Sequence, residues 1–250
     1  MRCVTSAPVG IEQLFLPAEC LLCHALLGER DAGGIVCPVC RHRWRPVRPP
    51  WCERCGQPEP HFGPCRLCAA WPAALTVVRS AVWLSDGARQ AVHALKYGGL
   101  PRIADDLTAA MPGALLPTDA ASVLVPIPLA PKRLRERGYN QSAALARALS
   151  RLWRIPVVDM LIRSRETATQ TTLTPETRLA NVAGAFATRN GELGTRNRSA
   201  FRLPTSALVL VDDVFTTGAT LAEAARALEQ GGARTIYGIT FGRAVIPDFT

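Results

Sequence analysis

The pattern of apolar and polar residues changes near residue 72. Beyond this point, short apolar runs alternate with stretches in which apolar residues recur at helical spacing. Before it no long helical pattern occurs, and cysteine, proline and arginine are abundant. We therefore predict a boundary near Trp71, with a small module over residues 1–72 and a larger domain over residues 73–250.

The apolar runs of the larger domain predict its strands, and the periodicity between them predicts its helices. The expected strands lie at residues 75–84, 122–127, 157–162, 181–188, 207–211 and 235–241. The expected helices run from the N-cap Asp86 to Gly98, from Pro101 along Ile103, Leu107 and Met111, along Leu145, Leu149 and Leu152, and over 221–230. This alternation predicts an α/β fold with a mostly parallel sheet and helices on both faces.

Composition and charge narrow the classes of protein to consider. The chain has 250 residues, of which 48% are hydrophobic, so it is too apolar to be disordered. Lysine and arginine total 29 against 20 acidic residues, a formal charge of +9, and only Lys96 and Lys132 are lysines. The surplus favours anionic partners such as phosphates, nucleic acid or acidic lipid. Codon bias would produce the same arginine-, alanine- and proline-rich composition, so the charge alone identifies no partner.

Eight of the nine cysteines form four C-x-x-C pairs within the first 70 residues. They are Cys20, Cys23, Cys37, Cys40, Cys52, Cys55, Cys65 and Cys68. Two thiolates fit on one tight turn, and two such turns complete the tetrahedron that Zn²⁺ prefers. Taken in order, the pairs predict two structural zinc sites, as in a double zinc ribbon. An interleaved pairing, the loss of one site, or a ligand role for His24 or His42 remain alternatives.

The cysteines also bear on the cellular compartment. The apolar residues between 11 and 27 are interrupted by polar ones, so no secretory signal is expected, and no run of 18 apolar residues could span a membrane. We expect a cytoplasmic protein with reduced thiols, in which the cysteines bind metal instead of forming disulfides. Because the module lacks an apolar core of its own, zinc should supply most of its folding energy.

Residues 208–220, LVLVDDVFTTGAT, are the most informative stretch of the larger domain. An apolar strand ends in Asp212 and Asp213 and runs through a Thr/Gly-rich loop into a helix. Ligands of open α/β sheets collect at this end of the strands, and Gly218 would let backbone N–H groups approach a phosphate. The two carboxylates suit ribose hydroxyls, or Mg²⁺ through water.

Each part of this stretch also has a simpler explanation. Thr220 and Glu223 match a capping box, and an aspartate after a strand is often a turn residue. The stretch is not a Walker A loop, and no G-x-G-x-x-G is present. Together, however, its residues predict a ligand site.

A basic segment after the strand at residues 122–127 is a second candidate. Lys132, Arg133, Arg135 and Arg137 place four positive charges within six residues, which suits a polyphosphate. The alternative is the solvated start of a basic helix.

Residues 208–220 resemble the phosphoribosyl pyrophosphate (PRPP) motif of type I phosphoribosyltransferases. Three more stretches are similar to the ComF/GntX family, which is related to competence protein ComFC: LKYGG at 95–99, PIPLAPKRLRERGYNQ at 126–141 and RETATQTTLTPETRLANVAGAF at 165–186. Leu16 and Pro17, followed by the cysteine pairs, resemble the zinc module of that family. The resemblance covers nearly the whole chain.

The resemblance implies a type I phosphoribosyltransferase-like fold and a role for each motif. Asp212 and Asp213 would be the catalytic residues and hold the ribose hydroxyls. The 5′-phosphate would bind to Thr216, Thr217, Gly218, Ala219 and Thr220, and the pyrophosphate, with Mg²⁺, to Lys132, Arg133, Arg135 and Arg137. Residues 165–181 correspond to the loop that covers the site in related enzymes.

Three functions are compatible with these features. The first is a PRPP-binding phosphoribosyltransferase with an unknown acceptor, acting in DNA uptake for natural transformation. The second is a competence component that binds single-stranded DNA and contacts DNA-uptake proteins, without catalysis. Its candidate DNA surface combines Arg41, Arg43, Arg45, Arg48, Arg54 and Arg66 with Trp44 and Trp51. The alternative is that these tryptophans form local core. The third is a PRPP sensor without catalysis.

Overall fold

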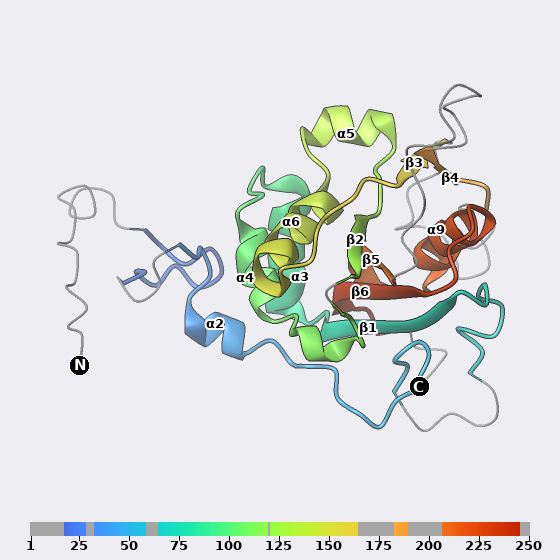
Figure 1. The fold of residues 1–250 in the computed structure, drawn as a ribbon. Helices are drawn as coiled ribbons and strands as arrows, with labels where there is room; N and C mark the ends of the chain where they lie inside the picture. The colour runs from blue at the N-terminus through green and yellow to red at the C-terminus, as the bar shows by residue number, and fades with distance from the viewer. Residues whose placement is uncertain are drawn as a thin grey trace, which may run out of the picture.

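The computed structural model describes residues 18–28, 33–58, 65–119, 121–164, 183–189 and 207–245. A four-stranded sheet forms its centre, in the order β1 (Leu75–Trp83), β6 (Ile236–Arg243), β5 (Leu208–Phe215) and β2 (Val123–Pro126). All neighbouring strands in this sheet are parallel. The predicted parallel sheet is therefore confirmed (Figure 1).

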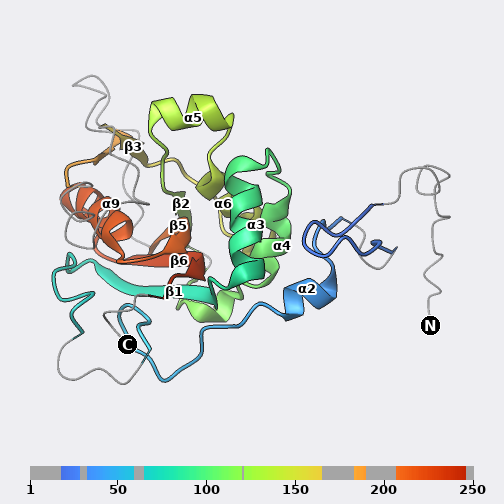
Figure 2. The same ribbon diagram turned by 180° about the vertical axis from the view of Figure 1, so that it is seen from behind.

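Helices cover both faces of this sheet, as the alternating side chains of its strands require. Val209 and Val211 of β5 pack with α3 (Asp86–Tyr97), α4 (Ile103–Ala109) and α6 (Gln141–Trp153). Leu208 and Leu210 face the opposite way and pack with α9 (Ala219–Gln230). Figures 1 and 2 show these helices on the two sides of the sheet.

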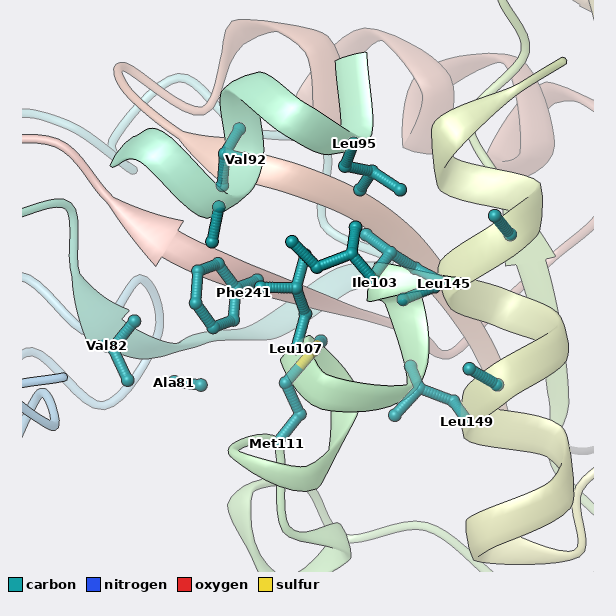
Figure 3. Packing of buried hydrophobic residues seen from close by; sticks show 14 of the residues in the cluster. Ala81, Val82, Val92, Leu95, Ile103, Leu107, Met111, Leu145, Leu149 and Phe241 are labelled. Carbon is teal, nitrogen blue, oxygen red and sulfur yellow. The ribbon is translucent and has the colours of Figure 1, made fainter. Parts of the chain in front are cut away.

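The core on the α3 side is built around one aromatic ring. Phe241 of β6 is fully buried and lies among side chains of all three helices, including Val92, Ile103 and Leu145 (Figure 3). These residues lie at the helical spacings that the sequence predicts, which explains why the helices dock on this face. Leu152, also expected on the apolar face of its helix, is instead exposed.

Several smaller elements complete the described fold. They are α2 (Pro38–His42), the short 3₁₀ helix η2 (Gly113–Leu115), α5 (Pro131–Arg137), and an antiparallel pair formed by β3 (Leu161–Arg163) and β4 (Phe186–Thr188). Within the described residues, none of the helices is both long and apolar enough to cross a membrane.

The structure corrects some predicted boundaries. The basic segment after β2 is the helix α5, which starts with Pro131 at its first turn and ends at Gly138, where φ is +79°. The strand predicted at residues 157–162 is shorter, and Val157 forms only an isolated bridge to Leu124. The strand predicted at residues 181–188 covers only β4 among the described residues.

Two helix starts also differ from the prediction. Ser85, not Asp86, occupies the N-cap of α3, and α9 begins at Ala219, two residues before the predicted start.

The cysteine-rich segment is packed closely against the larger domain. Residues 45–54 run along the outer edge of β1, where the Val47 N–H donates to the Ala81 carbonyl (3.0 Å) and the Val78 N–H donates to the Arg54 carbonyl (2.7 Å). This contact covers an edge strand that would otherwise be open. It also carries the chain from one face of the sheet to the other, so Cys37 packs with the α4 side and Cys55 with the α9 side.

Candidate functional site

The eight cysteines gather into two four-cysteine clusters. One contains Cys20, Cys23, Cys37 and Cys40, and the other Cys52, Cys55, Cys65 and Cys68; within each cluster all Sγ atoms lie within 4.8 Å of one another. This confirms the sequential pairing of the C-x-x-C turns and excludes the interleaved one. His24 and His42 belong to neither cluster.

The geometry of both clusters fits Zn²⁺. A tetrahedral ion with Zn–S distances of about 2.3 Å separates its sulfurs by about 3.8 Å. The Sγ atoms of Cys23 and Cys37 lie 3.7 Å apart, and those of Cys52 and Cys68 lie 3.8 Å apart. Backbone N–H groups also donate to Sγ atoms, and such hydrogen bonds stabilise a thiolate. One example is the Cys40 N–H, which donates to the Sγ atom of Cys37 (3.4 Å). Four thiolates would leave no open position on a bound ion, so each cluster suits a structural Zn²⁺ and not a catalytic one.

A cavity of about 360 Å³ lies at the carboxyl end of β5. Of the residues predicted to bind PRPP, Asp212, Asp213, Thr216, Thr217, Gly218, Ala219, Thr220 and Arg133 line it. Lys132 and Arg135 do not; both are exposed on α5. Arg137 turns toward Gln141 and places its guanidinium 5.1 Å from the centre of the Tyr97 ring. The structure therefore brings one of the four basic residues of α5 to the cavity.

The predicted phosphate loop, residues 216–220, runs from the end of β5 into the first turn of α9 and contains a left-handed turn. Gly218 has φ of +77° and is the N-cap of α9, with no side-chain capping bond. The capping box, which was the alternative explanation of Thr220 and Glu223, is not found: Thr220 lies inside the helix, and Glu223 accepts a hydrogen bond from the Gly184 N–H (2.7 Å). The amino end of α9 therefore faces the cavity without a side-chain cap, an arrangement that favours an anion.

The two aspartates lie within the last part of β5, next to a lysine from α3. Asp213 is 4% exposed, and its Oδ1 lies 2.8 Å from Nζ of Lys96. Asp212 Oδ1 accepts hydrogen bonds from Ser142 Oγ and from the Asp213 N–H, each at 2.9 Å. Asp213 Oδ2 and Thr217 Oγ1 are buried and have no hydrogen-bond partner among the described residues. Such atoms need a partner, and the two residues that carry them line the cavity.

The electrostatics of this group follow from its burial. Burial, together with the negative charge of Asp213, raises the pKa of Asp212 to about 7, although Lys96 and two hydrogen bonds act in the opposite direction. Burial by itself would lower the pKa of Lys96, but the charge of Asp213, its hydrogen bond to Lys96 and the charge of Asp212 together outweigh burial, so the pKa is raised. Lys96 is therefore an ammonium at neutral pH.

The sequence motifs missed several residues that line the cavity. Lys96 is the most important, and a signal was available, because it is one of only two lysines in an arginine-rich chain and lies in the LKYGG stretch. Arg163 of β3 also lines the cavity, with its guanidinium 5.3 Å from the centre of the Phe186 ring. No sequence pattern marks Arg163. Residues 165–181, expected to cover the site, lie outside the described residues.

Much of the predicted DNA surface of the cysteine-rich module serves packing. Trp44 is 4% exposed and lies edge-on to Phe241, with ring centres 5.0 Å apart. Arg54 donates hydrogen bonds to four backbone carbonyls, and Arg41 pairs with Asp106 at 3.2 Å. The alternative interpretation of Trp44 as core is thus confirmed. The exposed arginines of the set are Arg43, Arg45, Arg48 and Arg66.

Known protein families match both the cysteine-rich module and the larger domain of this chain. Residues 11–69 match a family model described as a double zinc ribbon domain, and residues 136–242 match one described as a phosphoribosyl transferase domain. The DNA utilization protein YhgH of Escherichia coli K12 is 32% identical over 238 residues, covering 89% of this chain and 96% of that protein. Competence protein ComFC of Bacillus subtilis is 30% identical over 218 residues, 84% of each chain. Competence protein F of Haemophilus influenzae is 35% identical over 114 residues, 45% of this chain and 46% of that protein.

Proposed function

This chain belongs to the ComF/GntX family, and from this premise we propose that it is a PRPP-binding phosphoribosyltransferase that acts in the uptake or use of DNA. The DNA role rests on the names of the relatives, and the phosphoribosyltransferase-type domain supports PRPP as the ligand. We infer a cytoplasmic location, since the two cysteine clusters need reduced thiols.

The observation that carries the PRPP proposal is the pair of unsatisfied polar atoms in the cavity. Among the described residues, Asp213 Oδ2 is a buried acceptor with no donor, and a ribose hydroxyl is a donor. Thr217 Oγ1 is a buried hydroxyl with no partner in the same part of the chain, and a phosphate oxygen would accept from it. One ligand that carries both a diol and a phosphate would satisfy both atoms.

The remaining cavity residues suit the departure of pyrophosphate. Arg133 of α5 and Arg163 of β3 line the cavity, and guanidinium groups bind phosphates in bidentate fashion. The carboxylates of Asp212 and Asp213 offer the oxygen ligands that Mg²⁺ takes. Bound there with PRPP, Mg²⁺ would neutralise charge on the pyrophosphate. Positive charge that develops at C1′ would be stabilised by the same carboxylates, and a nitrogen nucleophile would attack this carbon.

Calorimetry with PRPP and Mg²⁺ tests the binding. We expect the wild type to bind, and Asp213→Asn to bind about 10- to 100-fold more weakly, because the ribose would lose a charged acceptor. Asp105→Asn is the control, since Asp105 is half exposed and pairs with Arg151 on the surface. If the wild type does not bind PRPP, the proposal is wrong.

Turnover is tested separately by pyrophosphate release with PRPP, Mg²⁺ and cell extract as the source of the acceptor. Release that disappears in Asp213→Asn would support the enzyme and allow its product to be trapped. Binding without any release would favour the sensor over the enzyme.

A second candidate function is binding of single-stranded DNA by the cysteine-rich module. It is favoured by the exposure of Arg43, Arg45 and Arg48 along one short segment. Because phosphate contacts release counterions, the affinity should fall with salt and should fall further in an Arg43→Ala, Arg45→Ala variant. Equal binding by this variant and the wild type would refute this DNA surface.

A further inference from the structure

We propose that the second cysteine cluster holds the phosphate loop in its binding conformation, so that zinc at this cluster and phosphate in the cavity strengthen each other's binding. The second cluster is the one formed by Cys52, Cys55, Cys65 and Cys68. The phosphate half of the proposal rests on the proposed function, whereas the structural half concerns the loop alone. Two sets of contacts connect the cluster to Gly218.

The first set runs through Arg54 and Trp71. Arg54 lies between two ligands of the cluster in the sequence, and its Nη1 donates to the carbonyl of Cys68, a third ligand (3.0 Å). The same guanidinium donates to the carbonyls of Trp71 (3.3 Å) and Pro72 (2.7 Å). Arg54 therefore ties the backbone of Trp71 to the cluster.

The side chain of Trp71 packs directly against the phosphate loop at Gly218. Its side chain is 7% exposed, and a Cβ atom placed on Gly218 would lie 2.6 Å from its Cζ2 atom. The ring thus fills the space directly against the left-handed turn. If Trp71 moves, the turn loses the surface on which it rests.

The second set runs through Arg243 at the end of β6. Arg243 is 2% exposed; it donates to the carbonyl of Cys55 (3.0 Å) and to Oε1 of Gln57 (2.7 Å). Its guanidinium lies 4.4 Å from the centre of the Phe215 ring. Phe215 is the last residue of β5, and its ring forms the other side of the space at Gly218, 2.9 Å from the same Cβ position. Trp71 and Phe215 also contact each other, with ring centres 6.1 Å apart.

A zinc ion bound to the second cluster would also stabilise Arg243 electrostatically. Four thiolates and one Zn²⁺ carry a formal charge of about −2, which is a counter-charge for a buried guanidinium. Within the described part of the chain, Arg243 has no salt bridge to a carboxylate. Without zinc the four ligands are no longer held together, and the Cys55 carbonyl that accepts from Arg243 loses its fixed position. We therefore expect metal loss to release Arg243 and, with it, the support of Phe215.

The first cluster provides an internal control, because it is attached elsewhere. Asp106 of α4 accepts hydrogen bonds from the Ile35 N–H (2.9 Å) and from Arg41 (3.2 Å), which fixes the first cluster against α4. No described residue of this cluster lines the cavity. Loss of zinc from the first cluster should therefore leave the phosphate loop in place.

Coupling of this kind is reciprocal. If zinc raises the affinity for phosphate by some factor, phosphate raises the affinity of the second cluster for zinc by the same factor. Couplings of this sort typically amount to about 5- to 150-fold.

The experiment compares Cys65→Ser with Cys23→Ser in the full chain, each expected to retain one zinc ion by metal analysis. Hydrogen exchange of the amides at residues 216–221 should be faster than in the wild type for Cys65→Ser and unchanged for Cys23→Ser. The affinity for PRPP should fall at least about 5-fold in Cys65→Ser only. Equal changes in both variants, or no change in Cys65→Ser, would overturn the proposal.

A second measurement uses the wild type and needs no folded variant. Transfer of zinc to a chelator should be slowed by PRPP for one of the two ions, and unaffected transfer of both would contradict the coupling. If the wild type fails to bind PRPP, the proposed function is wrong, while the hydrogen exchange comparison still decides whether the cluster holds the loop.

Discussion

Substitution of Gly218 by alanine tests how tightly the phosphate loop is built. Two separate costs are expected. Gly218 has φ of +77°, a conformation that costs a residue with a Cβ about 1 to 2 kcal/mol. The added Cβ would also lie 2.6 Å from Trp71 and 2.9 Å from Phe215, and overpacking of this kind costs about 1 to 3 kcal/mol. The total loss of unfolding free energy should be about 2 to 5 kcal/mol.

Gly138 offers a matched control that separates the two costs. Its φ is +79°, nearly the same as at Gly218, but a Cβ there would meet nothing within 4 Å. Gly138→Ala should therefore lose only the conformational part, about 1 to 2 kcal/mol. The difference between the variants measures the contact of the loop with Trp71 and Phe215.

Urea unfolding of both variants, monitored by circular dichroism, gives the two free energies, and calorimetry gives their affinity for PRPP. Gly218→Ala should lose affinity because the turn must move away from Trp71, whereas Gly138→Ala should bind nearly as the wild type does. Equal destabilisation by the two substitutions would refute the reasoning, since it would mean that Trp71 and Phe215 yield to a Cβ without cost.

Three further predictions concern the charged groups. Lys96→Met should lower the unfolding free energy at pH 8 by about 1 to 3 kcal/mol, because it leaves the buried carboxylate of Asp213 without its ion pair. The loss should be smaller than for a fully buried pair, because a quarter of the Lys96 side chain is exposed. A variant as stable as the wild type in urea would contradict the ion pair with Asp213. The pKa of Asp212 is raised to about 7, so between about pH 4 and 7 the folded state keeps a proton that the unfolded state has released. The stability of the wild type should therefore fall as the pH rises through this range. The urea midpoint of Asp212→Asn should fall less over the same range, and parallel pH profiles of the two proteins would refute this assignment. Asp106→Asn should cost about 1 to 3 kcal/mol by weakening the bonds to Arg41 and the first cluster, and should speed zinc loss from that cluster only, as chelator assays would show.

The fold could be predicted from local patterns where those patterns determine the structure. The apolar run at residues 207–211 is found in β5, because both faces of this strand are buried. The helical spacing of Ile103 and Leu107 is found in α4, because burial of one face stabilises this helix. The basic segment after β2 forms the helix α5, as in the alternative of a basic helix start. Its side chains are not buried, so no apolar periodicity marks it.

The candidate site was only partly predictable, because its residues come from several separate elements. Asp212, Asp213 and the phosphate loop are contiguous in the sequence, so their proximity follows from chain connectivity. Lys96 and Arg163 reach the same cavity from other elements, and no spacing rule connects them to the aspartates. Arg135 and Lys132 have suitable charges, but the direction of α5 leaves them exposed.

Short segments of the chain carry their own chemistry, and this could be predicted from the sequence: cysteine pairs on tight turns, two adjacent carboxylates, and a glycine at a left-handed turn. Which of these segments meet depends on the packing of the whole fold. Arg243 bonds to the carbonyl of Cys55 although 188 residues separate them, and Trp71 rests against Gly218. The physical reason is that the parallel sheet places β6 beside both β1 and β5, and residues 45–54 along the edge of β1 place the second cluster against the same end of the fold. Contacts of this kind depend on how complete elements pack, which no local pattern encodes.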